Sequence, residues 1–325
     1  MPLYIGRTTK AAIVKEASWG AGGTANTFIP IVSESIQDKI EKIISPAAFG
    51  TLFPQSQYHG AHDVGGSFTQ FIDPDNIGLL TYMTLGSEAN AANGGAANVY
   101  DHAFTVAAAG TDLGSFGMEV QRGGSTSVYS GMAVNTFTLN MVRGGLLQGT
   151  FDVVGKAETD DSNNANFSPG TKTPFTFGMG AVSIGGANKT YVTSATLVYT
   201  NSLDADGAFV LTGNSTRGHV PYRLAPNISG TLECEWTSSS DELRDEIIDN
   251  EGLANLQFTF VSPQQISGAY YYTMTILIPA IRLQGDLPVV STMDRLPFTV
   301  NYTGMNNANA ITITLKDGLA TKWSA

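Results

Sequence analysis

The feature that most limits the fold of this chain is a pattern that occurs twice, a strand that leads directly into a short helix. One copy, GTLECEWTSSSDELRDEIID, runs from Gly230 to Asp249, and the other, GSFTQFIDPDNIGLLTYMTL, opens at Gly66. Aligning the two glycines without a gap matches Ile72 with Trp236, Leu79 with Leu243 and Met83 with Ile247. Almost no residue is identical, so the sequence predicts a duplication of form.

Each copy carries the local signals of a strand and of a helix start. Leu232, Cys234 and Trp236 alternate with acidic residues, as in a half-buried strand. The run TSSS then supplies side chains that can accept a bond from a free N–H at the helix start. In the first copy we expect Asp73 to cap the helix, Pro74 to take the first helical position and Gly86 to end it.

The segments around the two strand-to-helix patterns also correspond. The isoleucine spacing of Ile31 to Ile43 allows a helix, but the alternation at its start favours a strand. This strand and the segment 190–200 open the two halves, which contain strands around Phe104 and Phe258 and close on strands through Phe151 and Val300. The predicted organisation is an arm (1–30), a first unit (31–156), a polar linker (157–178), a second unit (179–304) and a tail (305–325).

Composition favours antiparallel sheets. The 36 glycines accompany many Thr, Ser, Asn and Val residues, which suit strands and turns better than helices. A chain of 325 residues with 42% hydrophobic residues can bury one or two cores, and we favour two. We therefore expect a mainly β protein with two tandem β-sandwich or barrel units, each with one short flanking α-helix.

Charge and cysteine content narrow the class further. The formal net charge of −11 opposes tight binding of nucleic acid, which needs clustered Lys and Arg. The single cysteine, Cys234, excludes an internal disulfide and fits a reduced cytosolic compartment. The first residues lack the apolar core of a signal peptide, and no run of residues is long and apolar enough for a membrane-spanning helix.

No motif indicates catalysis or a cofactor. His59, His62 and Asp63 resemble a metal cluster only weakly, because no further His or Cys stands nearby. The run DADG at Asp204 to Gly207 fits a turn better than a calcium loop. Cys234 alternates with apolar residues, so it is expected to be a core thiol. We expect no enzyme, no cofactor and no metal.

Four stretches of the sequence carry a resemblance to a known family: AAIVKEASWG, GGSFTQFIDPDNIGLLTYMTLG, YDHAFTV and SGMAVNTFTLNMVRGGLLQGTFDVVGKA. Through these stretches the chain resembles the tail tube proteins of long-tailed, non-contractile bacteriophages (siphophages). The resemblance implies a structural virion protein, assembled in the host cytoplasm, that polymerises into stacked rings around a lumen for DNA ejection. Two units in one chain imply a homotrimeric ring with pseudo-sixfold symmetry, and the alternative is a homohexamer. Other tail proteins would bind the tube ends.

The same assembly follows from the physics of sheets. Open edge strands tend to pair with other chains, and a closed ring of units satisfies them. Rings would then stack through the N-terminal arm, the loop SPAAFGTLFPQ, the linker and the C-terminal tail, because each holds apolar groups that have no visible core partner. The candidate residues for contacts between rings are Trp19, Phe49, Leu52, Phe53 and Trp323.

An acidic wall would suit a conduit, because carboxylates repel phosphates over about 8 to 10 Å at physiological salt. DNA would then pass without specific binding. Candidate lumen-facing residues are Glu119, Asp152, Asp286 and Asp294. The alternative interpretation is that these carboxylates lie on solvated outer faces.

Two other functions remain open on the sequence alone. A secreted or surface β-sandwich that binds glycans would use the Tyr270 to Tyr272 cluster, but the missing signal peptide opposes it. The tube of a contractile tail or of a secretion system would share the physics, but it normally carries one unit per subunit.

Overall fold

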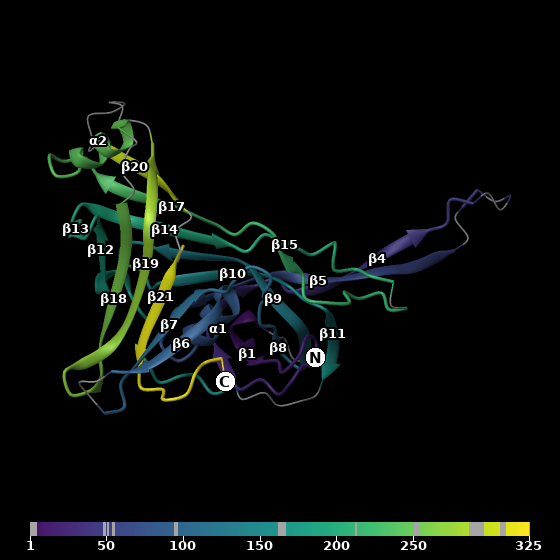
Figure 1. Cartoon of the computed structure of the whole chain (residues 1–325). Helices are drawn as coiled ribbons and strands as arrows, with labels where there is room; N and C mark the ends of the chain where they lie inside the picture. Colours follow the sequence, from purple (N-terminus) through teal and green to yellow (C-terminus); the bar gives the residue numbers. More distant parts are fainter. Residues whose placement is uncertain are drawn as a thin grey trace.

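The computed structural model describes residues 5–47, 50, 52–53, 56–93, 97–161, 167–211, 213–249, 254–285, 296–305 and 310–324. Its architecture is mainly antiparallel β, as predicted, with the two short helices α1 (Ile77–Leu85) and α2 (Asp241–Asp249) (Figure 1). Within the described residues, no helix has the length and apolar character needed to cross a membrane.

The strands of the first half form one ladder. The opening strand, interrupted after Glu34, pairs with the switch strand, which is the strand of the strand-to-helix pattern. The switch strand pairs with the closing strand, the closing strand with the long strand, and the long strand with its hairpin partner. This confirms the strand preferred for 31–43. In this order the strands are β3 (Ile31–Glu34) with β4 (Gln37–Ile44), β5 (Gln57–Phe71), β10 (Gln148–Val154), β9 (Ser125–Met141) and β8 (Phe116–Arg122).

The second half repeats this order of pairing. Its opening strand pairs with its switch strand, followed by the closing strand, the long strand and the hairpin partner. These strands are β14 (Val192–Thr200), β17 (Asn227–Glu235), β20 (Pro297–Gly304), β19 (Tyr270–Gln284) and β18 (Ala254–Ser267).

The remaining elements flank these two ladders. They are η1 (Gly6–Thr8), β1 (Lys10–Lys15), β2 (Thr27–Ile29), β6 (Gly86–Ala92), β7 (Tyr100–Val106), β11 (Ala157–Asp161), η2 (Phe177–Met179), β12 (Gly180–Ile184), β13 (Ala187–Asn188), β15 (Leu203–Asp204), β16 (Tyr222–Arg223) and β21 (Thr312–Asp317).

The two aligned glycines occupy equivalent places. A Cβ on Gly66 would lie 2.6 Å from the carbonyl oxygen of Ser35, and one on Gly230 would lie 2.1 Å from that of Thr196. In both ladders the switch strand therefore approaches the backbone of the opening strand too closely for a side chain.

The start of α1 differs from the expected one. The helix begins at Ile77, its N-cap residue is Asn76, and Pro74 lies in the preceding turn. The predictions that Asp73 caps the helix and that Pro74 takes its first position were therefore wrong. Asp73 closes this turn: its Oδ1 accepts the N–H of Asp75 at 2.8 Å, and its carbonyl oxygen accepts that of Ile77 at 3.2 Å. Gly86 ends the helix in the left-handed conformation (φ 90°), as predicted.

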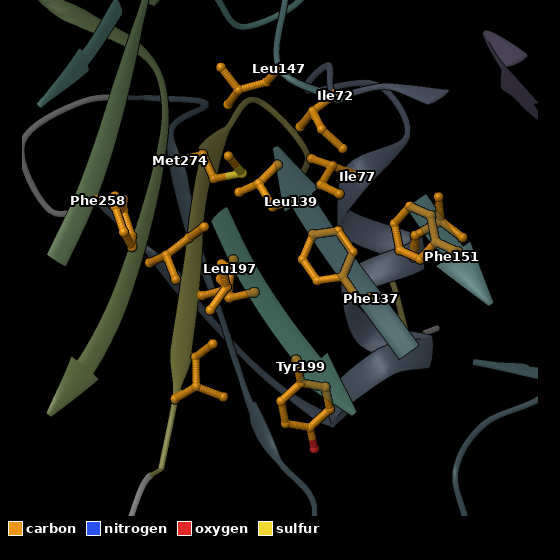
Figure 2. Close-up of a cluster of buried hydrophobic side chains, with 14 of the residues drawn as sticks. Ile72, Ile77, Phe137, Leu139, Leu147, Phe151, Leu197, Tyr199, Phe258 and Met274 are labelled. Atoms are coloured by element: carbon orange, nitrogen blue, oxygen red, sulfur yellow. The ribbon is translucent and has the colours of Figure 1, made fainter. Parts of the chain in front are cut away.

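The two halves share one core, so the expectation of two cores was wrong. Strand β14 of the second half pairs directly with β9 of the first, from Ala195 opposite Met141 to Thr200 opposite Thr136. Figure 2 shows the result, with side chains of the first half packed beside those of the second. Phe137, Leu139 and Phe151 lie in the same cluster as Leu197, Tyr199, Phe258 and Met274.

The presumed arm, linker and tail each contribute to this sheet and core, which corrects the expectation that they lack core partners. Strand β1 pairs with β8 and buries Ala11 and Ile13. In the linker, β11 pairs with β9, and Phe175 is fully buried. The tail supplies β21, which lies between β19 of the second half and β7 of the first.

Candidate assembly interface

The continuous sheet formed by both halves has one apolar and one polar face. Alternate residues such as Phe68, Phe151 and Phe137 are buried on the face that α1 covers. The residues between them form rows of short polar groups on the opposite face. One such row crosses from β5 to β19 in register: Thr69, Thr150, Thr138, Val198, Ser229, Thr303 and Arg282.

A second row has the same chemistry, and it consists of Asn140, Thr196, Thr231, Asn301 and Gln284. The hydroxyl oxygens of Thr69 and Thr150 lie 2.9 Å apart, so neighbouring strands also bond through these side chains. In these two rows the side chains are mainly hydroxyl and amide groups, and Arg282 carries their one charge.

The acidic residues predicted to face a lumen have different positions. Asp152 is exposed on the polar face, opposite Ser67 and Thr136 in the neighbouring strands. Glu119 is only 2% exposed, and its Oε1 accepts the backbone N–H of Ala25 at 3.0 Å. The prediction that Glu119 faces a lumen was therefore wrong, since its carboxylate is buried within the chain. Asp286 and Asp294 lie outside the described residues.

The hairpin of β4 and β5 projects from the body of the molecule (Figure 1). Near its tip, Leu52 is 97% exposed and Phe53 is 81% exposed. Further along the hairpin, Ile43, Ile44 and Tyr58 are also exposed. The third tip residue predicted for contacts, Phe49, lies outside the described residues. A projecting segment with this much exposed apolar surface is typical of a binding element.

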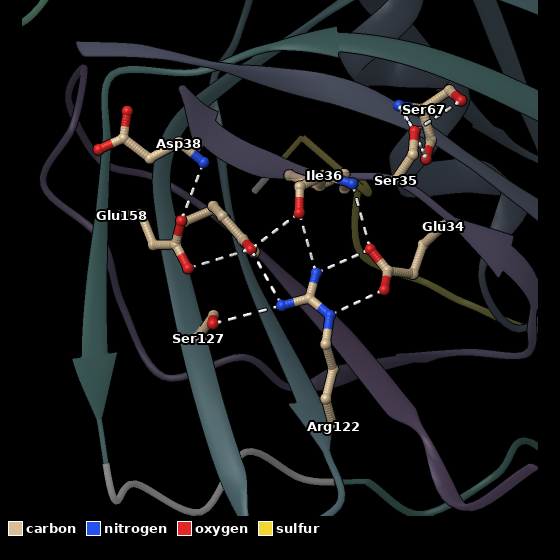
Figure 3. Close-up of polar contacts among 9 residues, drawn as sticks. Glu34, Ser35, Ile36, Asp38, Ser67, Arg122, Ser127 and Glu158 are labelled. Carbon is tan, nitrogen blue, oxygen red and sulfur yellow. Dashed lines mark hydrogen bonds and ion pairs between the residues drawn. The ribbon is translucent and has the colours of Figure 1, made fainter. Parts of the chain in front are cut away.

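The base of the hairpin is held by Arg122 on one side (Figure 3). Its guanidinium group donates two hydrogen bonds to Glu34, at 2.7 and 2.8 Å, and a third to the carbonyl oxygen of Ile36 at 2.9 Å. The Tyr129 hydroxyl donates to the same carbonyl at 3.0 Å. The hydrogen bonds from Arg122 lower the pKa of Glu34, which favours its charged form and strengthens the pair. The bonds from Arg122 to Glu34 and Ile36 hold the interruption between β3 and β4 in place.

Arg217 holds the other side of the hairpin base, although it comes from the second half. It is 2% exposed and donates to the carbonyl oxygens of Val64 and Gly155, at 3.2 and 2.8 Å, and to Oδ1 of Asp63 at 2.5 Å. Through it, the segment between β14 and β17 is attached to the hairpin of the first half.

The HGAHD stretch takes part in the same packing. His62 Nδ1 lies 2.6 Å from Oδ2 of Asp38, and its backbone N–H donates to the carbonyl oxygen of Ser215 at 2.8 Å. Among the residues that the structure describes, no three His, Cys, Asp or Glu side chains are grouped to hold a metal ion.

Sequence reasoning missed both arginines. The low number of basic residues, 17 Lys and Arg in 325, was the only feature of the sequence that drew attention to its arginines. That number does not say which arginines are buried.

The two tryptophans predicted to make contacts between rings pack against their own chain. The ring of Trp19 lies 3.3 Å from where a Cβ on Gly131 would stand. Trp323 packs against the core at Gly78 of α1, which corrects the expectation that it has no core partner. Its backbone N–H donates to Glu88 at 3.0 Å, and its Nε1 donates to Asp317 at 3.2 Å.

The carboxylates that bind Trp323 also enclose a buried histidine. His102 Nδ1 lies 2.7 Å from Oε1 of Glu88, and its Nε2 lies 3.1 Å from Oδ1 of Asp317. Burial alone would lower the pKa of His102, but the bonds to Asp317 and Glu88 outweigh it and raise this pKa to about 9. A charged imidazolium therefore holds the C-terminal segment on the first half.

The edges of the sheet determine how further copies could join it. Within the described residues, no strand pairs with the outer edge of β3 and β4. Part of that edge is bonded by side chains of the same chain: the carbonyl of Ile36 as above, and the N–H of Asp38, which donates to Glu158 at 3.0 Å. The corresponding edge of the second half, β14, is the one that pairs with β9.

Comparison with known proteins agrees with this architecture. No curated protein matches the chain. The model of a family described as phage tail tube protein matches residues 6–304, which is most of the sequence. The chain therefore belongs to the phage tail tube protein family.

Proposed function

We propose that three copies of this protein form a ring with pseudo-sixfold symmetry, and that stacked rings form the tube through which a siphophage ejects its DNA. Membership of the family implies a structural component of the virion tail that self-assembles into a tube. The observation that carries the finer proposal is the β9–β14 ladder, in which one half joins the next edge to edge within a single sheet.

The ladder suggests how a ring closes. If the two halves act as successive units of a ring that contains six such units, the same step repeated between chains returns to its start after three chains. The proposed units are those expected from the sequence, 31–156 and 179–304, extended by β11 and β21. These strands occupy similar places, since each follows the closing strand and pairs with the long strand of its own half.

The junction between two chains would differ in some residues from the β9–β14 ladder within one chain. The backbone groups of Ile36 and Asp38 already bond to Arg122, Tyr129 and Glu158. A neighbouring chain would pair on either side of these groups or displace the side chains. This network keeps a free edge from pairing at random, a protection that soluble sheet proteins require.

The polar face of the sheet is the proposed lumen wall. In the two rows described above, threonine, serine and asparagine side chains offer phosphates no cation, and Arg282 is the one cationic side chain. Tight binding of DNA requires several Lys or Arg contacts, so such a wall would let DNA slide. Of the predicted acidic residues, Asp152 is the one proposed to face the lumen. The proposed role is mechanical, with no catalysis, and other tail proteins would bind the ends of the tube.

Imaging and mass measurement test the proposal. The purified chain should form rings or tubes in negative-stain images, and native mass spectrometry should find three chains per ring. A ring of six chains would refute the pseudo-sixfold arrangement. A chain that stays monomeric at all concentrations, and that binds a glycan array, would refute the tube and support the rival β-sandwich.

A further inference from the structure

An antiparallel pair of strands precedes the opening strand in each half. In the first half, β1 pairs with the outer edge of β8, and β2 pairs back along β1. In the second half, β12 pairs with the outer edge of β18, and β13 pairs back along β12. Since β8 and β18 are the hairpin partners of the two long strands, the two pairs occupy equivalent places.

The two pairs differ in how far they extend. Strand β2 covers β1 from Ala11 to Ile13, and its Ile29 is fully buried in the common core. Strand β13 covers β12 only at Ser183 and Ile184. The rest of β12 therefore lacks the cover that β2 provides in the first half.

The uncovered part of β12 keeps an open edge. The N–H of Lys189 donates to the carbonyl oxygen of Val182 at 2.8 Å, and backbone groups two residues apart point to the same side of a strand. The N–H of Val182 and the carbonyl oxygen of Gly180 therefore point to this side as well. Within the described residues, no strand pairs with these two groups. They can bond to a strand of another polypeptide.

An apolar cavity of about 330 Å³ lies beside this open edge. It opens where β9 ends and β14 begins, at the last pair of the ladder that joins the two halves, Met141 and Ala195. The apolar side chains that line it are those of Met141, Phe177, Ala181, Val182, Val192, Ala195 and Phe260. Its volume is within the range of pockets that bind small ligands, so an aliphatic side chain fits.

An open strand edge beside an apolar cavity is the arrangement that recognises an extended peptide, since the edge bonds its backbone and the cavity selects one of its side chains. We propose that a different tail protein adds a strand to β12 here and inserts an aliphatic side chain into the cavity. The inference rests on the proposed function, in which other tail proteins bind the ends of the tube, and it names the surface that one of them uses.

The first half indicates the chemistry of the added strand. There the equivalent place is taken by β2, an antiparallel strand whose Ile29 is buried. In each copy β2 is already paired with β1, so the strand that joins β12 comes from another protein. The expected partner segment is extended, runs antiparallel to β12 and carries a β-branched aliphatic residue that faces the cavity.

Binding of a free peptide tests the site directly. The probe has the sequence of residues 24–32, TANTFIPIV, because it contains the strand that fills the equivalent place in the first half. Fluorescence anisotropy of the labelled peptide with the full-length chain should show saturable binding. The same peptide with Ile29→Asp should bind at least about tenfold more weakly, since burial of one aliphatic side chain changes an association constant by such a factor.

Two variants of the chain block the site in different ways. Ala195→Leu fills the cavity from β14, and Val182→Pro removes the N–H of the open edge, a place where proline is tolerated. Each should weaken binding of the peptide at least about tenfold, while the melting temperature stays close to that of the wild type. Ala187→Leu is the control, since Ala187 is exposed on β13 and does not line the cavity.

The inference would be overturned if the wild-type chain does not bind the peptide, or if both variants bind it as the wild type does. Self-association of the chain that both variants abolish, without binding of the peptide, would make a second copy the occupant. On assembled tubes, a gold-labelled peptide should mark the tube ends, and label along the whole tube would exclude an end protein. If the chain binds the peptide but forms no tube, it is the proposed function that fails.

Discussion

At the scale of single residues, the His102 cluster places a charged imidazole between two buried carboxylates. The imidazole is fully buried between Glu88 of β6 and Asp317 at the end of β21. Lys322 and Lys15 approach the same region and bond to the carbonyl oxygens of Glu88 and Ser324. A buried charge is stable only when it is paired in this way, so the cluster ties stability to the charge of His102.

We expect the protein to lose stability at alkaline pH because of this residue. Its pKa is 6.5 when unperturbed and about 9 in the fold. The stabilisation is thus fully present below pH 6.5 and is lost as the pH rises through about 9, and it amounts to on the order of 3 kcal/mol. Melting temperatures measured from pH 6 to about pH 10 check this.

Two variants make that measurement specific. His102→Asn should melt lower at neutral pH and lose most of the alkaline decline, whereas His59→Gln, at an exposed position, should behave like the wild type. A wild-type melting temperature that stays constant between pH 6.5 and about pH 10 would contradict the role given to His102.

At the scale of elements, two neighbouring strands approach each other unusually closely at Gly66, and two others do so at Gly230. At each position, the carbonyl of the opening strand leaves no space for a Cβ. Gly66 also has a φ of 145°, which side chains rarely allow. These glycines are needed for the geometry that brings each switch strand against its neighbour, and they explain why the alignment of the two copies begins with them.

Alanine at Gly230 should therefore destabilise the protein strongly. The added Cβ would overlap the Thr196 carbonyl and the Tyr302 hydroxyl, 2.1 and 2.3 Å away. We expect a loss of at least about 2 kcal/mol in the free energy of unfolding, measured by denaturant titration. Gly6→Ala is the matched control, because no atom lies within 4 Å of its Cβ. Equal stability of the two variants would show that this close approach can relax.

Local patterns predicted the strands and helices well, because alternation and capping are properties of neighbouring residues. The strand through Cys234, the end of α1 at Gly86 and the buried thiol were all confirmed. The glycine cluster at 20–23 was not understood from sequence. The backbone N–H groups of Gly20 and Gly22 donate hydrogen bonds to the carboxylate of Glu16, at 3.0 and 2.9 Å.

Pairing between distant segments could not be predicted. The β9–β14 ladder and the place of β21 depend on which edges meet in space, and alternation along a strand carries no information about its partner. The apparent lack of core partners in the arm and the tail had the same cause. For the candidate site, Leu52 and Phe53 are exposed, and their contacts between rings stay a prediction. The burial of Glu119 could not be predicted, since it depends on a contact with Ala25.

At the scale of the whole molecule, the two halves depend on each other through β21. This strand pairs with β19 on one side and β7 on the other. It also buries Ile313 and Leu315, and Ile311 beside it is fully buried. Burial of each such side chain stabilises a fold by about 1.5–3 kcal/mol, so this one strand supplies a large share of a typical net stability of about 5–15 kcal/mol.

Removal of residues 305–325 should therefore unfold or aggregate the protein. It would expose one edge in each half and remove the carboxylate of Asp317 from His102. Light scattering and circular dichroism of the purified chain measure the outcome. Removal of residues 1–7 is the control, because Ile5, Gly6 and Arg7 are exposed. A shortened chain lacking 305–325 that stays monomeric and melts like the full chain would contradict this dependence.

The position of β21 also has a consequence for biosynthesis. The ribosome makes β7 long before it makes β21, so during translation the edge of β7 that β21 will cover has no partner from its own chain. Nascent chains on neighbouring ribosomes would carry the same open edge, and open edges are where sheet proteins aggregate. Any chaperone that shields this edge would therefore act in the interval that ends with the synthesis of β21.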